Sequence, residues 1–381
     1  MIASLYFNRH RSFSILEKRR ATDLSSSTDD LLSTSDRDSS DDESTTELLE
    51  AEKQVWLGNR GTCCGIPIWQ TDTSRFAGNL HSRILQKFPF LVEMFYWALN
   101  YVAYSMTKRI AAHVFATHGG EEVTALAQSH AIDILTLEHD TFLSVFFPIT
   151  EVSVQRFFLH HQSILSIFNQ LYSLVHIPGT VAFLSWYYYV APNHNAFTVV
   201  RRTMTLGNFA AFFVFAFYPC MPPRLLPKSF GFKDTVRQEN AESVWVGGAN
   251  VNQLAAMPSL HFTYAFVIGC TFLYHSGIVA AVLGKRTRRS RRFGAVAKIL
   301  YAFAAVLYPA LVLTIIVATA NHYYLDAAVA TISVTLSYFS NRIWLVLQPL
   351  ELALLWVLRL EKPVPTTGMH RQKSSRRHIE V

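Results

Sequence analysis

Long apolar stretches constrain the fold of this chain more than any other feature. A helix needs about 20 predominantly apolar residues to cross a bilayer. Six stretches approach or exceed this length, at about 88–106, 164–190, 198–219, 258–283, 296–319 and 322–347. Because backbone polar groups must be paired within lipid, each stretch is expected to be an α-helix. The sequence therefore predicts an all-α, polytopic membrane protein with about six transmembrane helices.

The composition agrees with this prediction. Of the 381 residues, 50% are hydrophobic and only 16% are charged, whereas soluble proteins carry about 25% charged residues. The chain also contains 28 Phe and 16 Tyr, which suit spans and their interfacial aromatic belts. Its four cysteines form neither a disulfide framework nor a zinc-binding spacing.

The remaining segments predict three parts of the chain. Residues 1–80 are expected to be a disordered, Ser-rich and acidic cytoplasmic tail, since residues 29–50 hold nine acids against one base. Residues 81–360 form the predicted transmembrane catalytic domain, and residues 361–381 form a basic cytoplasmic tail. Within the domain, residues 131–161 alternate acids with apolar residues, so an interfacial helix is expected before the second span.

Basic residues between the spans predict the orientation of the chain. In the loop KRTRRSRR, residues 285–292, six of eight residues are Lys or Arg. The positive-inside rule places this loop, and with it both termini, on the cytoplasmic side. Lys108 and Arg109 are exceptions, because they fall on the opposite side.

The same topology collects unusual polar residues at the non-cytoplasmic face. Arg224 follows the third span in FYPCMPPRLLP, and His261 opens the fourth span after Pro258 and Ser259. Pro258 suits the first position of a helix, and the free N–H groups at such a helix start favour an anion. Arg224 and Ser259 are therefore candidates for binding the phosphate group of a substrate.

His322 and Asp326 open the sixth span in NHYYLDAAVA. A spacing of four residues puts both side chains on one face of a helix. A carboxylate there can fix the tautomer of the imidazole and make its other nitrogen more basic. Such an imidazole can attack phosphorus, while His261 protonates the departing oxygen as a general acid.

These motifs carry a resemblance to a known family. PSLH and His-x-x-x-Asp resemble the second and third signature motifs of the type 2 phosphatidic acid phosphatase superfamily. NQLYSLVH, YPCMPPRLLP, AAMPSLHFTYAF and NHYYLDAAVA resemble a branch that includes the fungal inositol phosphorylceramide synthases and inositolphosphotransferases. The similarity covers about residues 130–345.

The resemblance implies a role for each catalytic residue. His322 is the nucleophile that forms a phosphohistidine, and Asp326 orients it. His261 is the acid that releases the first product and the base that activates the acceptor. The resemblance implies neither a metal nor another cofactor. Two cations of the wider superfamily are missing, because Phe217 and Ile316 stand at their positions.

Three further residues are candidates for a headgroup pocket, each with an alternative role. Asn252 and Gln253 precede the fourth span, where turn formation explains GGANVN equally well. His176 lies in the second span, where an interhelical hydrogen bond is the alternative. Asn321 is expected to cap the sixth span, and Arg224 has the alternative of anchoring lipid headgroups.

Together these features predict a metal-independent membrane lipid phosphotransferase that works through a phosphohistidine. An inositol-phosphate headgroup is a candidate for the group that it transfers. Its partners are a lipid phosphate and the bilayer, with no nucleic acid, because the basic run is a short loop between spans. An endomembrane of the Golgi or endoplasmic reticulum is expected, with the site on the lumenal or extracellular face. The alternatives are a lipid phosphate phosphatase with water as acceptor, and a non-catalytic scaffold or transporter.

Overall fold

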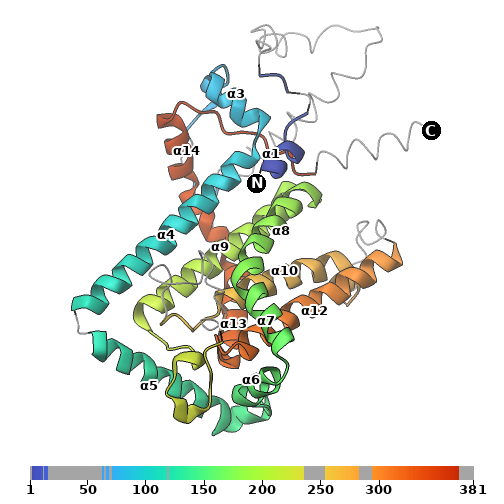
Figure 1. The fold of residues 1–381 in the computed structure, drawn as a ribbon. Helices are drawn as coiled ribbons and strands as arrows, with labels where there is room; N and C mark the ends of the chain where they lie inside the picture. Colours follow the sequence, from blue (N-terminus) through green and yellow to red (C-terminus); the bar gives the residue numbers. More distant parts are fainter. Residues whose placement is uncertain are drawn as a thin grey trace, which may run out of the picture. The chain divides into compact units, whose positions relative to one another are not determined.

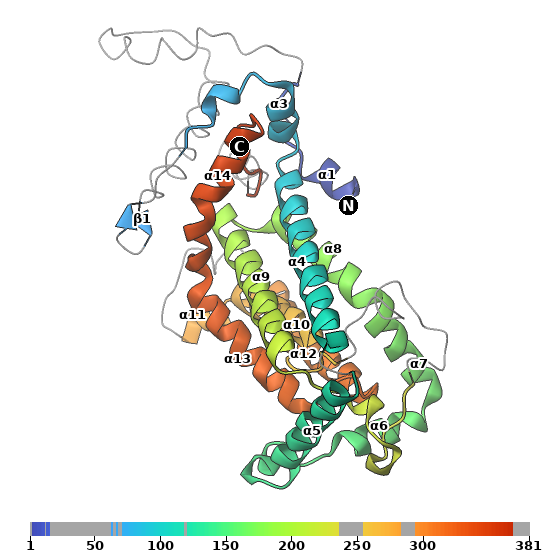
Figure 2. The same ribbon diagram turned by 90° about the vertical axis from the view of Figure 1, so that its left-hand side faces the viewer.

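The computed structural model describes residues 2–11, 13–15, 62–63, 66–67, 71–117, 120–235, 254–282 and 294–368 (Figures 1 and 2). These residues are predominantly helical, which confirms the predicted helical class. Their two-residue strands β1 Thr62–Cys63 and β2 Ile66–Pro67 pair with each other in antiparallel fashion. The acidic run at 29–50, the loop KRTRRSRR and residues 369–381 lie outside the described residues.

The described residues include ten helices of at least nine residues. They are α4 Phe90–Thr117, α5 Gly120–His139, α6 Glu151–Leu159, α7 Gln162–Gln170, α8 His176–Val190, α9 His194–Phe217, α10 Leu260–Ser276, α12 Ala295–Ala318, α13 Tyr324–Ser340 and α14 Gln348–Val357. Shorter helical elements connect them or lie near the ends, namely α1 Ile2–Phe7, η3 Ser74–Phe76, α3 Leu80–Lys87, η4 Phe142–Val145, η5 Leu171–Val175, η6 Pro223–Leu225, η7 Lys228–Phe230, α11 Ile278–Val282 and η10 Asn341–Leu347.

Each of the six predicted spans is largely helical, but the number of helices that cross a membrane stays a prediction. Within the described part of the chain, one helix, α12, is long and apolar enough to do so by length and composition. Helices α10 and α13 have 17 residues each, which is shorter than the usual span. Helices α4 and α9 contain charged residues, for example Glu93 in α4 and Arg201 in α9.

The chain divides into two compact units, of which the first comprises residues 1–96, 188–194 and 342–381. In this unit the segment after α14 packs against α3. The backbone N–H of Glu361 donates to Ser82 Oγ at 2.9 Å, and that of Val364 donates to Gln86 Oε1 at 3.0 Å. The first residues of the predicted basic tail are therefore part of this packed unit.

The second unit, residues 97–187 and 195–341, contains the closely packed pair α10 and α12 (Figure 1). A Cβ atom on Gly269 would lie 2.6 Å from Pro309 Cγ and 2.8 Å from the Ala305 carbonyl oxygen. Glycine is therefore required for the two helices to approach this closely. Since α13 also packs on α10, the starts of α10 and α13 and the end of α12 come together.

The predicted interfacial segment at 131–161 is divided between α5, η4 and α6. Its polar residues Glu138, Glu151 and Gln155 are buried, whereas Phe142 and Phe146 on the connection are exposed. The segment thus buries polar residues together with the apolar residues Ala131 and Ile134. The buried acids must therefore find polar partners inside the protein.

Candidate active site

His322 lies in the turn that joins α12 to α13, and its side chain is buried. Its Nδ1 atom lies 2.8 Å from the carbonyl oxygen of Ala256 and 3.1 Å from Oδ2 of Asp326. A carbonyl oxygen can only accept a hydrogen bond, so Nδ1 carries the hydrogen. In the neutral imidazole this assignment leaves the lone pair on Nε2, which is the atom that can attack an electrophile.

Asp326 holds His322 through a helix cap. The carboxylate is fully buried, and its Oδ2 atom also accepts the backbone N–H of Tyr323, the N-cap residue of α13, at 3.0 Å. His322 therefore precedes the helix, and the two side chains do not meet on a shared helix face as the spacing of four suggested. The helix start itself fixes the carboxylate beside the imidazole.

His261 lies in the first turn of α10, and its ring centroid is 5.9 Å from that of His322. The helix begins at Leu260, with Ser259 as the N-cap residue, so Pro258 lies before the cap and not at the first helical position. Ser259 is buried, and its Oγ atom accepts the N–H of Phe262 at 3.3 Å. The two histidines thus open two different helices at one end of the second unit.

Arg224 belongs to η6 and is fixed to the same turn as His322. Its backbone N–H donates to the carbonyl of Ala320 at 2.9 Å, and its Nε donates to Asn321 Oδ1 at 2.9 Å. Its Nη1 donates to Asp234 Oδ2 at 3.2 Å. Asn321 therefore does not cap α13 as expected, but orients the guanidinium group. Asp234 was not predicted, because an acid ten residues beyond the YPCMPPR motif carries no signal of its own.

His176 and Tyr172 line the other side of His261. The ring of Tyr172 stacks on His261 at 4.0 Å between centroids, and the ring centroid of His176 lies 5.0 Å away. Tyr172 sits in a π-helical turn, Leu171–Val175, a rare geometry that is frequent at functional sites. The Nδ1 atom of His176 is 3.5 Å from the hydroxyl of Tyr308. Sequence reasoning selected His176 but missed Tyr172 and the π-turn.

The structure thus brings together Arg224, Ser259, His261, His322 and Asp326, with His176 beside His261. The other two predicted pocket residues, Asn252 and Gln253, lie outside the described residues. The two positions that lack the superfamily cations have different surroundings. Phe217 is exposed at the end of α9, whereas Ile316 is buried in the core. Neither position supplies a positive charge to the site.

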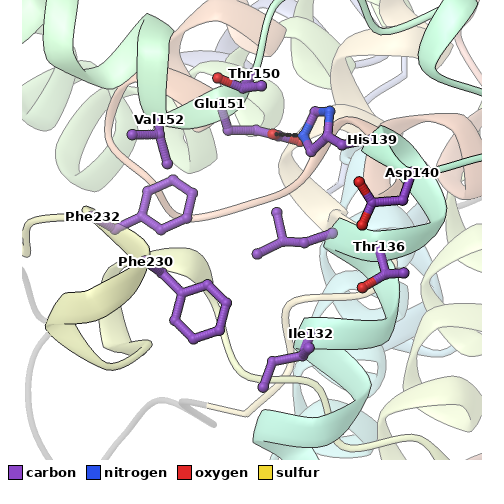
Figure 3. Close-up of a pocket in the computed structure, with 10 residues that line it drawn as sticks. Ile132, Thr136, His139, Asp140, Thr150, Glu151, Val152, Phe230 and Phe232 are labelled. Carbon is purple, nitrogen blue, oxygen red and sulfur yellow. Dashed lines mark hydrogen bonds and ion pairs between the residues drawn. The ribbon is translucent and has the colours of Figure 1, made fainter.

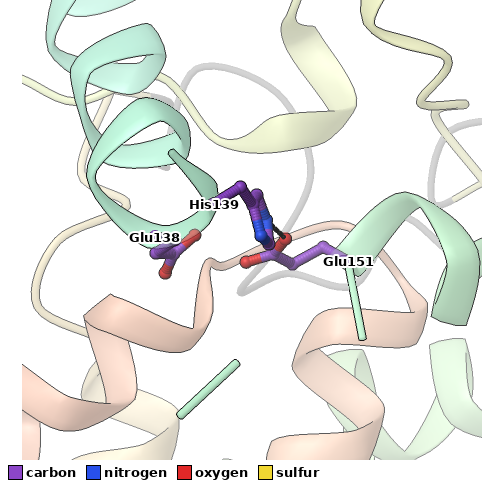
Figure 4. A group of neighbouring side chains, drawn as sticks. All are labelled: Glu138, His139 and Glu151. Atoms are coloured by element: carbon purple, nitrogen blue, oxygen red, sulfur yellow. Dashed lines mark hydrogen bonds and ion pairs between the residues drawn. The ribbon is translucent and has the colours of Figure 1, made fainter. Parts of the chain in front are cut away.

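A pocket of about 300 Å³ lies in the second unit, and none of the predicted site residues lines it (Figure 3). Its walls are mostly apolar and include Phe230 and Phe232, while His139 and Glu151 form a polar edge. Among the described residues, His139, Glu151 and Glu138 also form a group whose ligand atoms lie within 4.8 Å of one another (Figure 4). No motif in the sequence indicated this cluster.

Comparison with known proteins agrees with the motifs. Residues 132–284 match a family model described as the PAP2 superfamily. The matched region contains Arg224, Ser259 and His261 and ends before His322 and Asp326. No curated protein and no solved structure matches the chain. The family match supports the PAP2 superfamily, the type 2 phosphatidic acid phosphatases, and with it phosphatase or phosphotransferase chemistry on phosphate esters.

Proposed function

We propose that this chain is a membrane lipid phosphotransferase that acts through a covalent phosphohistidine on His322. The observation that carries the proposal is the orientation of His322. Its Nδ1 atom is held by Ala256 and Asp326, which leaves Nε2 free, and a second imidazole lies 5.9 Å away. An oriented nucleophile with a neighbouring acid is the arrangement that covalent phosphoryl transfer requires.

The first half-reaction forms the covalent intermediate. Arg224 and the free N–H groups at the start of α10 bind the phosphate oxygens. Nε2 of His322 attacks phosphorus, the bond from phosphorus to the leaving oxygen breaks, and His261 donates a proton to that oxygen. Asp326 stabilises the positive charge that develops on the His322 ring.

The second half-reaction returns the enzyme to its starting state. His261 accepts the proton of an acceptor hydroxyl, whose oxygen attacks the phosphohistidine. The bond from phosphorus to nitrogen breaks, and its electron pair returns to Nε2 of His322. A lipid or inositol hydroxyl as acceptor makes the enzyme a transferase, and water makes it a phosphatase. Neither step requires a metal ion.

The exposed apolar surface supports the proposed membrane setting. On α12, Val296, Ile299, Phe303 and Val306 are all exposed, and a row of exposed apolar side chains on a long helix suits contact with lipid. We propose that the lipid substrate enters laterally, keeping its acyl chains in the bilayer while its headgroup reaches Arg224. The predicted orientation places this site on the lumenal or extracellular face.

The proposal is tested with detergent-purified wild-type protein, the His322→Ala variant and a matched control. His160→Ala is the control, because His160 is exposed and its Nδ1 atom bonds the carbonyl of Arg156 one turn earlier. Each protein is incubated with ³²P-labelled phosphatidic acid, phosphatidylinositol and a sphingoid phosphate, with and without a ceramide acceptor, in excess chelator. Free phosphate and labelled lipid products are measured separately.

Wild type and His160→Ala should turn over at least one of these lipids and carry an acid-labile phosphate label. His322→Ala should do neither, while remaining folded in detergent. Labelled lipid product indicates the transferase, and free phosphate indicates the phosphatase. Turnover by His322→Ala would refute the nucleophile assignment. Inactivity of the wild type on all three lipids would favour the scaffold or transporter alternative.

A further inference from the structure

Two buried glutamates contact the start of the helix that follows His322. The backbone N–H of Leu325 donates to Glu138 Oε1 at 2.5 Å, and that of Tyr324 donates to Glu151 Oε1 at 3.3 Å. These are N–H groups of the first turn of α13, which have no partner within the helix. Glu138 comes from the end of α5 and Glu151 from the start of α6, so the two helices jointly cap α13.

The two carboxyl groups are too close, and too deeply buried, to be ionised together. Both side chains are fully buried, and their oxygens belong to the group that lies within 4.8 Å (Figure 4). As an ionised oxygen, Glu138 Oε2 has no hydrogen-bond donor among the described residues. Like charges at this spacing in a dry site raise the pKa of one partner. A single proton between the two groups removes the repulsion and supplies the missing donor.

The surroundings indicate which group keeps the proton. Glu151 Oε2 lies 2.7 Å from His139 Nε2, and Glu151 also accepts the N–H of Tyr324. Glu151 borders the pocket of Figure 3, whereas Glu138 does not. Burial raises the pKa of Glu138 to about 10, and the hydrogen bond and negative charge of Glu151 add to the effect. Glu138 is therefore the protonated partner and Glu151 the charged one.

Several other titratable groups face this pair. They are Asp326 on α13, His139 on α5, and Cys220 and Tyr323 nearby. The charge of Asp326 disfavours a second anion at Glu138 in the same way as Glu151 does. The start of α13 thus faces two carboxylates, Asp326 and Glu151, and one neutral carboxyl group.

We propose that Glu138 and Glu151 share one proton, and that this acid pair is a positioning device that holds the start of α13, and thereby His322 and Asp326, in place. The catalytic part of this inference rests on the proposed function. The sharing of a proton and the holding of the start of α13 do not depend on the proposed function. A divalent cation bound by Glu138, His139 and Glu151 is the competing explanation of the same geometry.

Isosteric variants separate the roles of the two acids. In Glu138→Gln the amide replaces a neutral carboxyl group, because it can donate to Glu151 and accept from Leu325. In Glu151→Gln the anion that accepts from His139 and Tyr324 is lost. Glu138→Ala removes both the donor and the acceptor. Asp140→Asn is the matched control, since Asp140 is an exposed acid directly after the end of α5.

Two measurements on these proteins do not depend on activity. Infrared spectroscopy should show the carbonyl band of a buried protonated carboxylic acid in wild type and Asp140→Asn, and its loss in Glu138→Gln. Hydrogen exchange of residues 319–330 should remain slow in Glu138→Gln and become at least tenfold faster in Glu138→Ala and Glu151→Gln. If Glu151→Gln does not fold, the difference in exchange rate between Glu138→Gln and Glu138→Ala still tests the proposal.

A third measurement tests the positioning of His322. On the lipid that the wild type uses, Glu138→Gln should keep its rate of phosphoenzyme formation within threefold. Glu138→Ala should lose at least tenfold in kcat with little change in KM. If these rates do not follow the exchange rates, the pair holds the helix without positioning the nucleophile, and the catalytic part of the inference fails. If no lipid is turned over by the wild type, the proposed function fails. The infrared and exchange results then still test whether the two acids share a proton and hold the start of α13.

Metal binding is tested on the same proteins. Metal content is measured in the purified proteins, and again after adding Zn²⁺ or Mn²⁺ alone. The proposal expects no stoichiometric metal and no dependence on Glu138. One bound metal in wild type that is lost in Glu138→Gln would overturn it. The absence of the protonated carboxyl band in wild type would also overturn the proposal. Equal acceleration of hydrogen exchange in Glu138→Gln and Glu138→Ala would overturn it as well.

Discussion

The role of Asp326 gives the most discriminating prediction for the proposed mechanism. In Asp326→Asn, the amide oxygen can replace Oδ2 and still accept from His322 Nδ1 and the N–H of Tyr323. The amide NH₂ group then replaces Oδ1, which is buried without a hydrogen-bond partner among the described residues. The substitution therefore removes the negative charge and preserves the cap, so α13 should keep its start.

The structure also limits the size of the effect. His322 Nδ1 is held at 2.8 Å by the carbonyl of Ala256 as well as by Asp326, so the tautomer does not depend on the carboxylate alone. What is lost is the difference between a hydrogen bond to a charged group and one to a neutral group, about 1–1.5 kcal/mol. At about 1.4 kcal/mol for each factor of ten, we expect kcat to fall about 5- to 12-fold.

The assay is the rate of phosphoenzyme formation in a single turnover, with His322→Ala as the inactive reference. Asp326→Asn should still form the acid-labile label, but more slowly. If it is as inactive as His322→Ala, the Ala256 carbonyl does not hold the tautomer and the reading of this geometry is wrong. If its rate equals that of wild type, Asp326 does not stabilise the charged imidazole.

Three further predictions follow from other contacts. Arg224→Lys should lose about as much activity as Arg224→Ala, because a lysine cannot replace the planar fork that bonds Asn321 and Asp234; steady-state kinetics on the active lipid compares the two. Gly269→Ala should destabilise the fold by about 1–3 kcal/mol by overpacking. Gly179→Ala should not, because no atom of the described residues lies within 4 Å of the added Cβ; thermal unfolding in detergent measures both. The raised pKa of Glu138 means that its stabilising proton is fully present below the unfolded value of 4.5 and is lost as pH rises through the folded value of about 10. The thermal stability of wild type should therefore fall over this window by up to about 1.4 kcal/mol per pH unit, and Glu138→Gln should show a flatter curve.

The helices and the convergence of the motif residues could be predicted from the sequence. Long apolar stretches are strong signals, and their alternating direction brings Arg224, His261 and His322 to one end. The way in which His322 contacts Asp326 could not be predicted from the sequence. A spacing of four residues fits both a shared helix face and a side chain that caps the helix start, and the sequence does not distinguish between them.

The buried acids were missed for a different physical reason. Acids alternating with apolar residues usually indicate an amphipathic surface, because a buried carboxylate is costly. Glu138 and Glu151 avoid this cost by accepting N–H groups of α13, a helix that begins more than 170 residues later in the chain. Asp234 pairs with Arg224, ten residues earlier, across the segment that contains η7. Local sequence patterns contain no information about such partners.

The charges around His322 bear on the choice between transferase and phosphatase. Among the described residues, Arg224 is the cation that contacts the site, and Asp234 already offsets part of its charge. Phe217 and Ile316 supply no cation where the wider superfamily has one. A phosphate monoester brings about two negative charges beside the buried Asp326, whereas a phosphodiester brings one. Because uncompensated charge is costly in a buried site, a diester lipid is the better-matched donor. A diester attacked by His322 loses one alcohol and leaves the other on phosphorus, so its headgroup is transferred together with the phosphate. The shortage of cations therefore favours headgroup transfer over simple removal of phosphate.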